Sequence, residues 1–207
     1  MFIGEEREWT YSEEQAWHRL ALSAPAEVCR RTGACFDEYS GAYILNVFNA
    51  SIAVHPGHRE IWGTGELCNM LLGELSQYSC LPILWYLVQA QDILASGSLI
   101  NPRKLAGGLI FGRGSHALPL DKLAAKYGGD MAAFLKKGAS LGGEYSDYGD
   151  ASIRLYPFPR VPVLLVLWRE NEEFPANAVL LLDATCPRYL PTDIVWATAM
   201  LSVLVML

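Results

Sequence analysis

A chain of 207 residues fits one domain with a full hydrophobic core, and such a core needs no disulfides or structural metal to close it. Hydrophobic residues make up 52% of the chain and charged residues only 18%, which predicts a well-filled core or a surface partly covered by a partner. The formal net charge of −6, without a run of Lys and Arg, excludes a phosphate-tracking surface, so no nucleic-acid partner is expected.

The N-terminus and the cysteines bear on the compartment. Residues 1–8 carry acids where a signal peptide needs a basic start and an apolar run, so we expect the protein to be cytoplasmic. The five cysteines are dispersed and form no Cys-x-x-Cys pair, which indicates buried thiols and not a disulfide framework or an iron–sulfur signature. Cys29 and Cys35 are the only local candidates for redox or metal chemistry.

The first predicted element is a helix. Ser12 and Gln15 have the spacing of a capping box, so the helix is expected to start at Ser12. Pro25 is expected to kink or divide it, and Gly33 to close the region.

Strands and helices of different lengths follow. Residues 42–48 are rich in β-formers and predict a strand, with residues 51–54 as its hairpin partner before a turn at Pro56. Pro82 in the first turn and apolar residues almost all round predict that the helix 81–94 is buried. Shorter helices are expected at 67–75, 118–126 and 131–137, with a polar loop at 142–150.

The centre of the core is expected in two aliphatic runs. Residues 152–156 alternate polar and apolar, as in a half-exposed strand, and Pro157 is expected to break it. Residues 163–168 and 178–182 are apolar on both faces, which predicts a central antiparallel hairpin. The fold class is therefore predicted to be α+β, a mainly antiparallel sheet with helices packed over it.

The last predicted helix starts at Asp193, with Thr192 as its cap, and runs to Leu207. Its apolar run is short of the roughly 20 residues that span a bilayer, so no membrane span is expected. Apolar residues occupy most of its circumference. It is therefore expected to lie between the sheet and either the helix 81–94 or a second subunit, which leaves a homodimer or another protein partner open.

Several segments resemble one known family. The run Trp168-x-Glu170-x-Glu172-Glu173-Phe174-Pro175, with residues 181–183 and 189–193, is similar to the C-terminal signature of domain-of-unknown-function family 3786, which is prokaryotic and uncharacterised. Residues 84–87 and 101–108 with Phe111 resemble that family's apolar helix and Gly-Gly segment. The resemblance covers residues 42–207, and the chain length predicts a single domain over 1–207 in which a helical segment at 1–41 precedes this family-like region. Some relatives adjoin an iron–sulfur domain, which implies a setting in anaerobic redox or one-carbon metabolism.

Two groups of residues are candidates for ligand binding. Glu170, Glu172, Glu173 and Asp183 are expected at the same end of the central hairpin, where they could bind Mg²⁺ or Ca²⁺ or share a proton. The alternative is a solvated turn.

The second group surrounds a Gly-rich loop. Arg103, Lys104, Arg113 and His116 put positive charge there, which favours a small anion over a dinucleotide because the strand and helix context of a dinucleotide site is missing. His55 and His58 flank a Pro-Gly turn and are expected to be exposed, so no zinc or iron site is expected.

Two functions therefore remain open. The first is a binding or accessory protein that presents the acidic connection and the Gly-rich loop to a small ligand or a protein partner. The second is a metal-dependent enzyme that uses the Glu and Asp cluster. They differ in whether Glu172, Glu173 and Asp183 converge on a cavity or splay into solvent. The sequence names no cofactor and no reaction.

Overall fold

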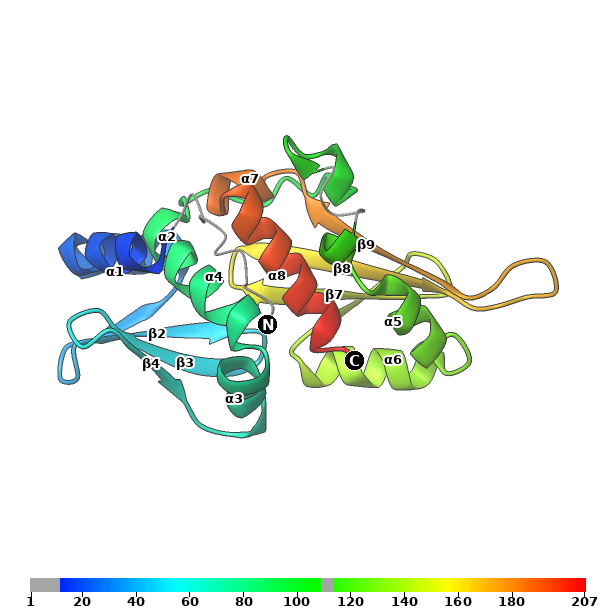
Figure 1. The fold of residues 1–207 in the computed structure, drawn as a ribbon, viewed down its shortest axis with the longest axis horizontal. Coiled ribbons are helices and arrows are strands. Elements are labelled where there is room, and N and C mark those ends of the chain that lie inside the picture. Colours follow the sequence, from blue (N-terminus) through cyan, green and yellow to red (C-terminus); the bar gives the residue numbers. More distant parts are fainter. Residues whose placement is uncertain (1–11, 109–113) are drawn as a thin grey trace, which may run out of the picture.

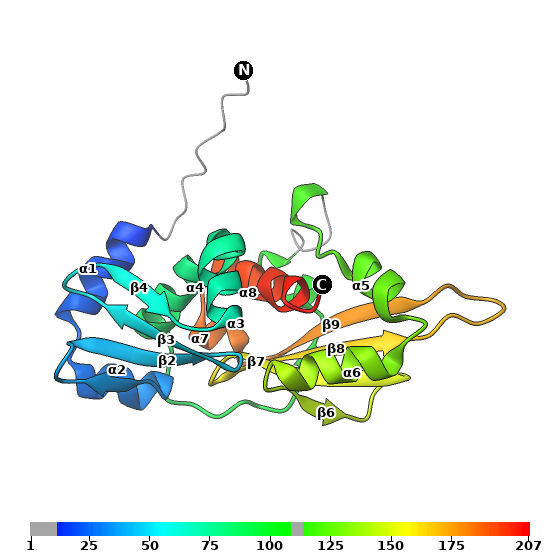
Figure 2. The same ribbon diagram turned by 90° about the horizontal axis from the view of Figure 1, so that it is seen from below.

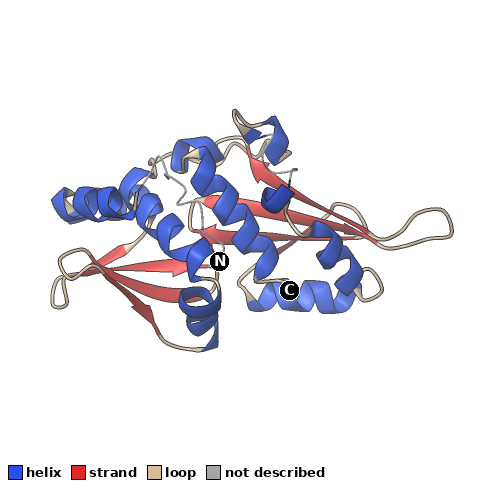
Figure 3. Cartoon of the chain, in the orientation of Figure 1, coloured by secondary structure: helices blue, strands red, loops and turns tan. Residues whose placement is uncertain are grey.

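The computed structural model of the protein describes residues 12–108 and 114–207. Its strands form two antiparallel sheets, one of four strands and one of five, and both sheets are accompanied by helices (Figure 3). The predicted α+β class is confirmed. The strands are divided between two sheets, however, where the sequence predicted one.

Two short helices begin the described chain. Helix α1 (Glu13–Leu22) is capped by Ser12, whose hydroxyl accepts a hydrogen bond of 3.2 Å from the backbone N–H of Gln15. Pro25 opens helix α2 (Pro25–Thr32), which ends at Gly33 with a φ of 74°. The predicted Ser12 cap and the division at Pro25 are confirmed, because Pro fits the first turn of a helix and Gly tolerates the left-handed cap.

The first sheet is built around a hairpin. Strands β2 (Ala42–Val47) and β3 (Ala50–His55) pair antiparallel, as predicted, and are flanked by β1 (Cys35–Asp37) and β4 (Glu60–Gly63) in the order β1-β2-β3-β4. The two outer strands were not predicted, because each is only three or four residues long and neither shows a sustained apolar alternation.

The buried helix starts and ends earlier than predicted. Helix α3 (Glu66–Asn69) and a π-helical turn (Met70–Glu74) lead into α4 (Ser76–Gln89), so Pro82 lies inside the helix and not in its first turn. The Arg31 guanidinium donates to the carbonyl of Ala90 at 2.6 Å and to that of Val88 at 3.3 Å, which satisfies the last carbonyls and ends the helix before residue 94.

The second sheet has the predicted hairpin at its centre. Strands β7 (Ala151–Phe158), β8 (Val161–Trp168) and β9 (Asn177–Asp183) are flanked by β5 (Leu99–Ile100) and β6 (Glu144–Ser146) in the order β5-β9-β8-β7-β6. Strand β6 lies in the predicted polar loop. Pro157 does not break β7, because a register shift between Leu155 and Phe158 accommodates it.

Helices cover one face of this sheet. Short 3₁₀ turns at Pro102–Lys104 and Gly114–His116 precede α5 (Leu120–Tyr127) and α6 (Met131–Ser140), and α7 (Cys186–Tyr189) precedes α8 (Thr192–Leu204). Figure 2 shows α5, α6 and α8 on the same side of β7, β8 and β9. In the part of the chain that the structure describes, no helix covers the opposite face, and the segment between α4 and β5 crosses it.

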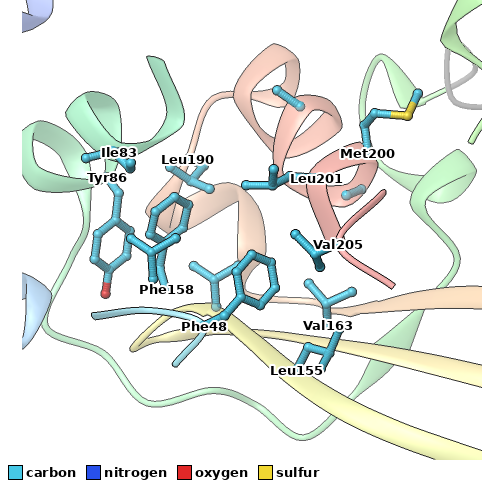
Figure 4. Close-up of a cluster of buried hydrophobic side chains, with 14 of the residues drawn as sticks. Phe48, Ile83, Tyr86, Leu155, Phe158, Val163, Leu190, Met200, Leu201 and Val205 are labelled. Carbon is cyan, nitrogen blue, oxygen red and sulfur yellow. The ribbon is translucent and has the colours of Figure 1, made fainter. Parts of the chain in front are cut away.

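The C-terminal helix α8 is buried within the chain. It lies alongside α4 (Figure 1), and Figure 4 shows Leu201 of α8 and Val205, which directly follows α8, among Ile83 of α4 and Leu155 and Val163 of the sheet. Residues 194–203 are all buried, so the intramolecular form of the prediction is confirmed and no second subunit is needed to cover this helix.

The predicted start of α8 is wrong. Pro191 occupies the cap position, and the hydroxyl of Thr192 donates instead to the carbonyl of Ala106 at 3.3 Å. No helix among residues 12–108 and 114–207 is long and apolar enough to cross a membrane.

Candidate functional site

A hollow of about 260 Å³ lies on the helix-free face of the five-stranded sheet. The chain between α4 and β5 forms one wall, and strands β7 and β8 form the floor. The lining residues are Ile93, Leu94, Ala95, Gly97, Leu99, Arg154, Tyr156, Pro159, Arg160, Pro162, Leu164, Asp183 and Tyr189. Most of them are apolar, so the hollow suits an organic molecule better than a bare ion.

Strand pleating and register bring the floor residues together. Arg154 and Tyr156 are two apart on β7 and share a face, and Arg154 is paired with Leu164 of β8. Ile153 and Leu155, which alternate with them along the strand, point to the covered face and are fully buried. The alternation that the sequence shows at residues 152–156 therefore separates the core from the hollow.

Asp183 fixes the wall of the hollow. Its Oδ1 accepts hydrogen bonds from the backbone N–H of Ser96 at 3.0 Å and the Ser96 hydroxyl at 2.9 Å, and its Oδ2 accepts from the Gly97 N–H at 2.7 Å. The backbone N–H and hydroxyl of Thr185 complete the set at 2.9 and 2.5 Å. Three of these five donors tie the crossing segment to the end of β9, and the two of Thr185 hold the carboxylate from β9's own side.

These donors hold Asp183 as a carboxylate although the residue is only 2% exposed. Burial by itself raises the pKa of Asp183, but hydrogen bonds from Thr185 and Ser96 outweigh burial and set the pKa below its ordinary value. Because the oxygens are already occupied, this carboxylate serves to position the wall and is not an available metal ligand or general base.

Arg160 and Tyr189 hold the other end of the wall. The Arg160 guanidinium lies 2.9 Å from a carboxylate oxygen of Asp92 and donates to the carbonyl of Arg30 at 3.0 Å. The Tyr189 hydroxyl donates to the carbonyl of Ile93 at 2.8 Å. Both groups are thus engaged in fastening residues 92–93 to the body of the protein.

Arg154 differs from Arg160 because its charge is not paired. Within residues 12–108 and 114–207, no carboxylate oxygen lies within 4.0 Å of its guanidinium. Its neighbour on the strand, Tyr156, donates to Glu144 at 2.9 Å. Burial and Glu144 raise the pKa of Tyr156, whereas a hydrogen bond from Arg154 lowers it. Arg154 is half-buried, so its charge is available at the rim of the hollow.

The acidic candidates are not brought together. Glu170, Glu172 and Glu173 are exposed in the β8–β9 connection, which projects from the body of the protein (Figure 1). Trp168 pairs with Asn177 at that end, whereas Asp183 lies at the opposite end of β9. The expectation of one cluster is wrong, because the last residue of a hairpin's second strand lies beside the start of its first.

The basic candidates are also dispersed. Arg103 is exposed and lines a separate hollow of about 230 Å³, and Arg113 lies outside the described residues. The His116 ring packs edge-on against Trp196 with 5.1 Å between centroids, and the His116 carbonyl accepts from the Trp196 indole N–H at 2.8 Å. His116 thus helps to cover α8, whereas Arg103 lines the separate hollow, so these two described residues have different surroundings.

The residues considered for metal binding have other partners. The rings of His55 and His58 stack with 4.0 Å between centroids, and the backbone N–H of His58 donates to the His55 Nδ1 at 2.9 Å. In the described part of the chain, no group of three or more His, Cys, Asp or Glu residues is arranged to hold a metal ion.

Arg154 and Tyr156 were not predicted as site residues from the sequence. The available signal was the alternation at 152–156, which leaves an arginine and a tyrosine on the less buried face of a strand next to the central hairpin. The crossing wall gave no signal, since Gly97 and Asp183 are brought together only by the pairing of β5 with β9.

The fold defines an α+β protein whose five-stranded sheet has a hollow on its open face. The chain belongs to the family described as Domain of unknown function (DUF3786), whose model matches residues 24–204. The match confirms the predicted family and reaches further upstream than Ala42. The comparison with curated proteins found no match, and neither did the comparison with solved structures.

Proposed function

We propose that the protein is a binding or accessory module that holds a small organic molecule in the hollow on the open sheet face. The observation that supports this proposal best is the hollow itself, of about 260 Å³, with a mostly apolar lining and a wall held in place by Asp183. Ligand sites commonly combine an apolar lining with a few placed polar groups and are largely preformed. The volume, just below the usual range of about 300 to 1,000 Å³ for such sites, fits a small metabolite.

A binding role is supported over the metal-dependent enzyme. The alternative required Glu172, Glu173 and Asp183 to converge, but the glutamates splay into solvent and Asp183 lies elsewhere with its oxygens engaged. Residues 1–207 would then act as one domain, since a single hydrophobic cluster takes residues from both sheets. The anaerobic redox or one-carbon setting implied by the family resemblance belongs to the same proposal.

Equilibrium dialysis against a mixed metabolite extract, read by mass spectrometry, tests the proposal. The wild-type protein should enrich one or a few compounds, and Leu99→Trp should not, because the larger side chain fills the hollow from an edge strand. Leu22→Trp, at a 75% exposed position on α1, is the matched control and should bind as the wild type does. Equal enrichment by Leu99→Trp, or none by the wild type, would refute the proposal.

The projecting β8–β9 connection supports a second role, contact with a protein partner. Phe174 is 65% exposed there, beside Glu172 and Glu173, and Asn171 orders the turn by accepting from the backbone N–H groups of Glu173 and Phe174 at 2.9 and 2.8 Å. Ordered, exposed aromatic side chains are typical of protein contacts.

A photo-crosslinking residue placed at position 174 tests this role in cells. It should give a discrete protein adduct, whereas the same residue at the fully exposed turn position 39 should not. Absence of an adduct specific to position 174 would refute it.

A further inference from the structure

We infer that the ligand of the open-face hollow is an organic anion, a carboxylate with a small apolar body, and that Arg154 binds its charged end. This inference rests on the proposed binding function and adds the chemical class of the ligand. It is carried by the contrast between the two arginines that line the hollow.

The two arginines differ in whether a carboxylate of the protein balances their charge. Arg160 is paired with Asp92 at 2.9 Å, so its charge is balanced by a residue of the protein. Arg154 has no carboxylate within 4.0 Å in residues 12–108 and 114–207, although Glu144 is its cross-strand partner on β6. The Glu144 carboxylate accepts instead from the Tyr156 hydroxyl. A half-buried guanidinium without a carboxylate partner, at the rim of a hollow, is suited to bind an external carboxylate, often through two hydrogen bonds.

The second step concerns Asp183, the carboxylate that lines the same hollow. Arg154 pairs with Leu164, which pairs with Leu181, and Asp183 lies two residues further along β9. Two strand spacings and two residues of rise place the two Cα atoms roughly 12 Å apart. Five hydrogen-bond donors surround Asp183. Because these donors already bind the Asp183 oxygens, they offset the negative charge that an anion at Arg154 would meet.

The third step concerns the body of the ligand. Between Arg154 and Asp183 the floor consists of Leu164 and Pro162, and Leu99 adds an apolar side chain from the edge. An apolar group of a few carbon atoms can cover these residues while its carboxylate reaches Arg154. An inorganic anion such as phosphate would leave this apolar floor in water, so it fits the hollow less well.

Paired probes test this assignment. Butanoate, hexanoate and benzoate are compared with their primary amides by calorimetric titration of the full chain. The wild-type protein should prefer each carboxylate that binds over its amide. Arg154→Gln should weaken carboxylate binding about 10- to 100-fold, the range for a hydrogen bond to a charged group, and change amide binding by less than about threefold.

Two controls keep the outcomes distinct. Arg169→Gln removes an exposed arginine from the far end of β8 and should leave carboxylate binding unchanged. Circular dichroism verifies that Arg154→Gln is folded. If carboxylates and amides bind the wild type equally, or if Arg154→Gln keeps the carboxylate preference, the anion assignment is overturned while a binding function stands. If no probe binds and dialysis finds no metabolite either, the proposed function fails as well.

Discussion

The two faces of the five-stranded sheet differ in what covers them, although adjacent residues of the same strands form both faces. On the covered face, Leu165 and Leu167 of β8 are fully buried beneath helices and belong to the main hydrophobic cluster. On the open face, Leu164 is 1% exposed but lies outside that cluster and lines the hollow. Burial alone therefore does not separate core from site. The elements that pack against a residue distinguish the core from the site.

The residues that cover each face explain the difference. Helices α5, α6 and α8 press on one face, whereas a segment without regular structure crosses the other and is held by Asp183. Near Gly149, whose φ is 61°, the chain approaches the open face so closely that an added Cβ would lie 2.7 Å from Val166. That approach closes the sheet around Val166 and leaves the hollow at Leu164.

The largest effect is expected from breaking the covered face. The double substitution Trp196→Glu, Leu204→Glu places one carboxylate at a buried position of α8 and a second at a partly buried one, and should abolish folding because buried unpaired charges are very costly. Circular dichroism and light scattering give the readout. Leu207→Glu, at a 37% exposed position, is the control and should fold. A folded monomeric double mutant would contradict intramolecular burial of α8.

A sharper comparison uses two adjacent leucines. Leu165→Ala should lower the free energy of unfolding by roughly 2 to 5 kcal/mol, because it leaves a cavity in a packed core. Leu164→Ala should cost less, roughly 1 to 2 kcal/mol, because it only enlarges a hollow that already exists. Chemical denaturation measures both. Equal costs would mean that the two faces are packed alike.

Asp183 links the open face to pH. Asp183→Asn should destabilise the protein by roughly 1.5 to 3 kcal/mol, since hydrogen bonds to a charged acceptor are lost. The folded-state pKa of Asp183 is lowered, so its stabilisation is present above the unfolded-state pKa of about 3.9 and is lost as the pH falls through the folded value. Between neutral and acidic pH, the free energy of unfolding should therefore fall less steeply for Asp183→Asn than for the wild type, as measured by chemical denaturation at each pH. Parallel curves would contradict this role.

The smallest effect is expected at the projecting connection. Glu170→Gln, Glu172→Gln and Glu173→Gln should each change the free energy of unfolding by less than about 0.5 kcal/mol, because these side chains are exposed. Denaturation of the three variants beside Asp183→Asn makes the comparison. A large loss in any of the three would show that the connection has a structural role.

The sequence predicts the covered face well and the open face poorly. Two-sided apolar runs identified β8 and β9, and the all-round apolar character of α8 indicated its burial, because core packing requires apolar residues at regular spacing. The family signature could also be identified, because its residues follow one another along the chain. These features are local and periodic.

The candidate site depends on contacts between distant segments. Asp183 meets Ser96 across 87 positions, and Arg154 lies beside the crossing wall only because β5 pairs with β9. Polar residues such as Asp183 carry no periodic signal, so the sequence placed it with the glutamates of the connection. The neighbours of Asp183 are set by its position at the end of β9. Its closeness in sequence to the acidic residues of the connection does not bring it near them in space.

The most direct test of the open-face site is a two-dimensional NMR titration with the probe carboxylate that binds best. The amide signals that shift should belong to the wall and floor of the hollow, namely Gly97, Leu99, Arg154, Tyr156 and Leu164. The same titration of Arg154→Gln should give much smaller shifts at these residues. Shifts concentrated instead around Arg103 and His116 or in the β8–β9 connection would contradict the account.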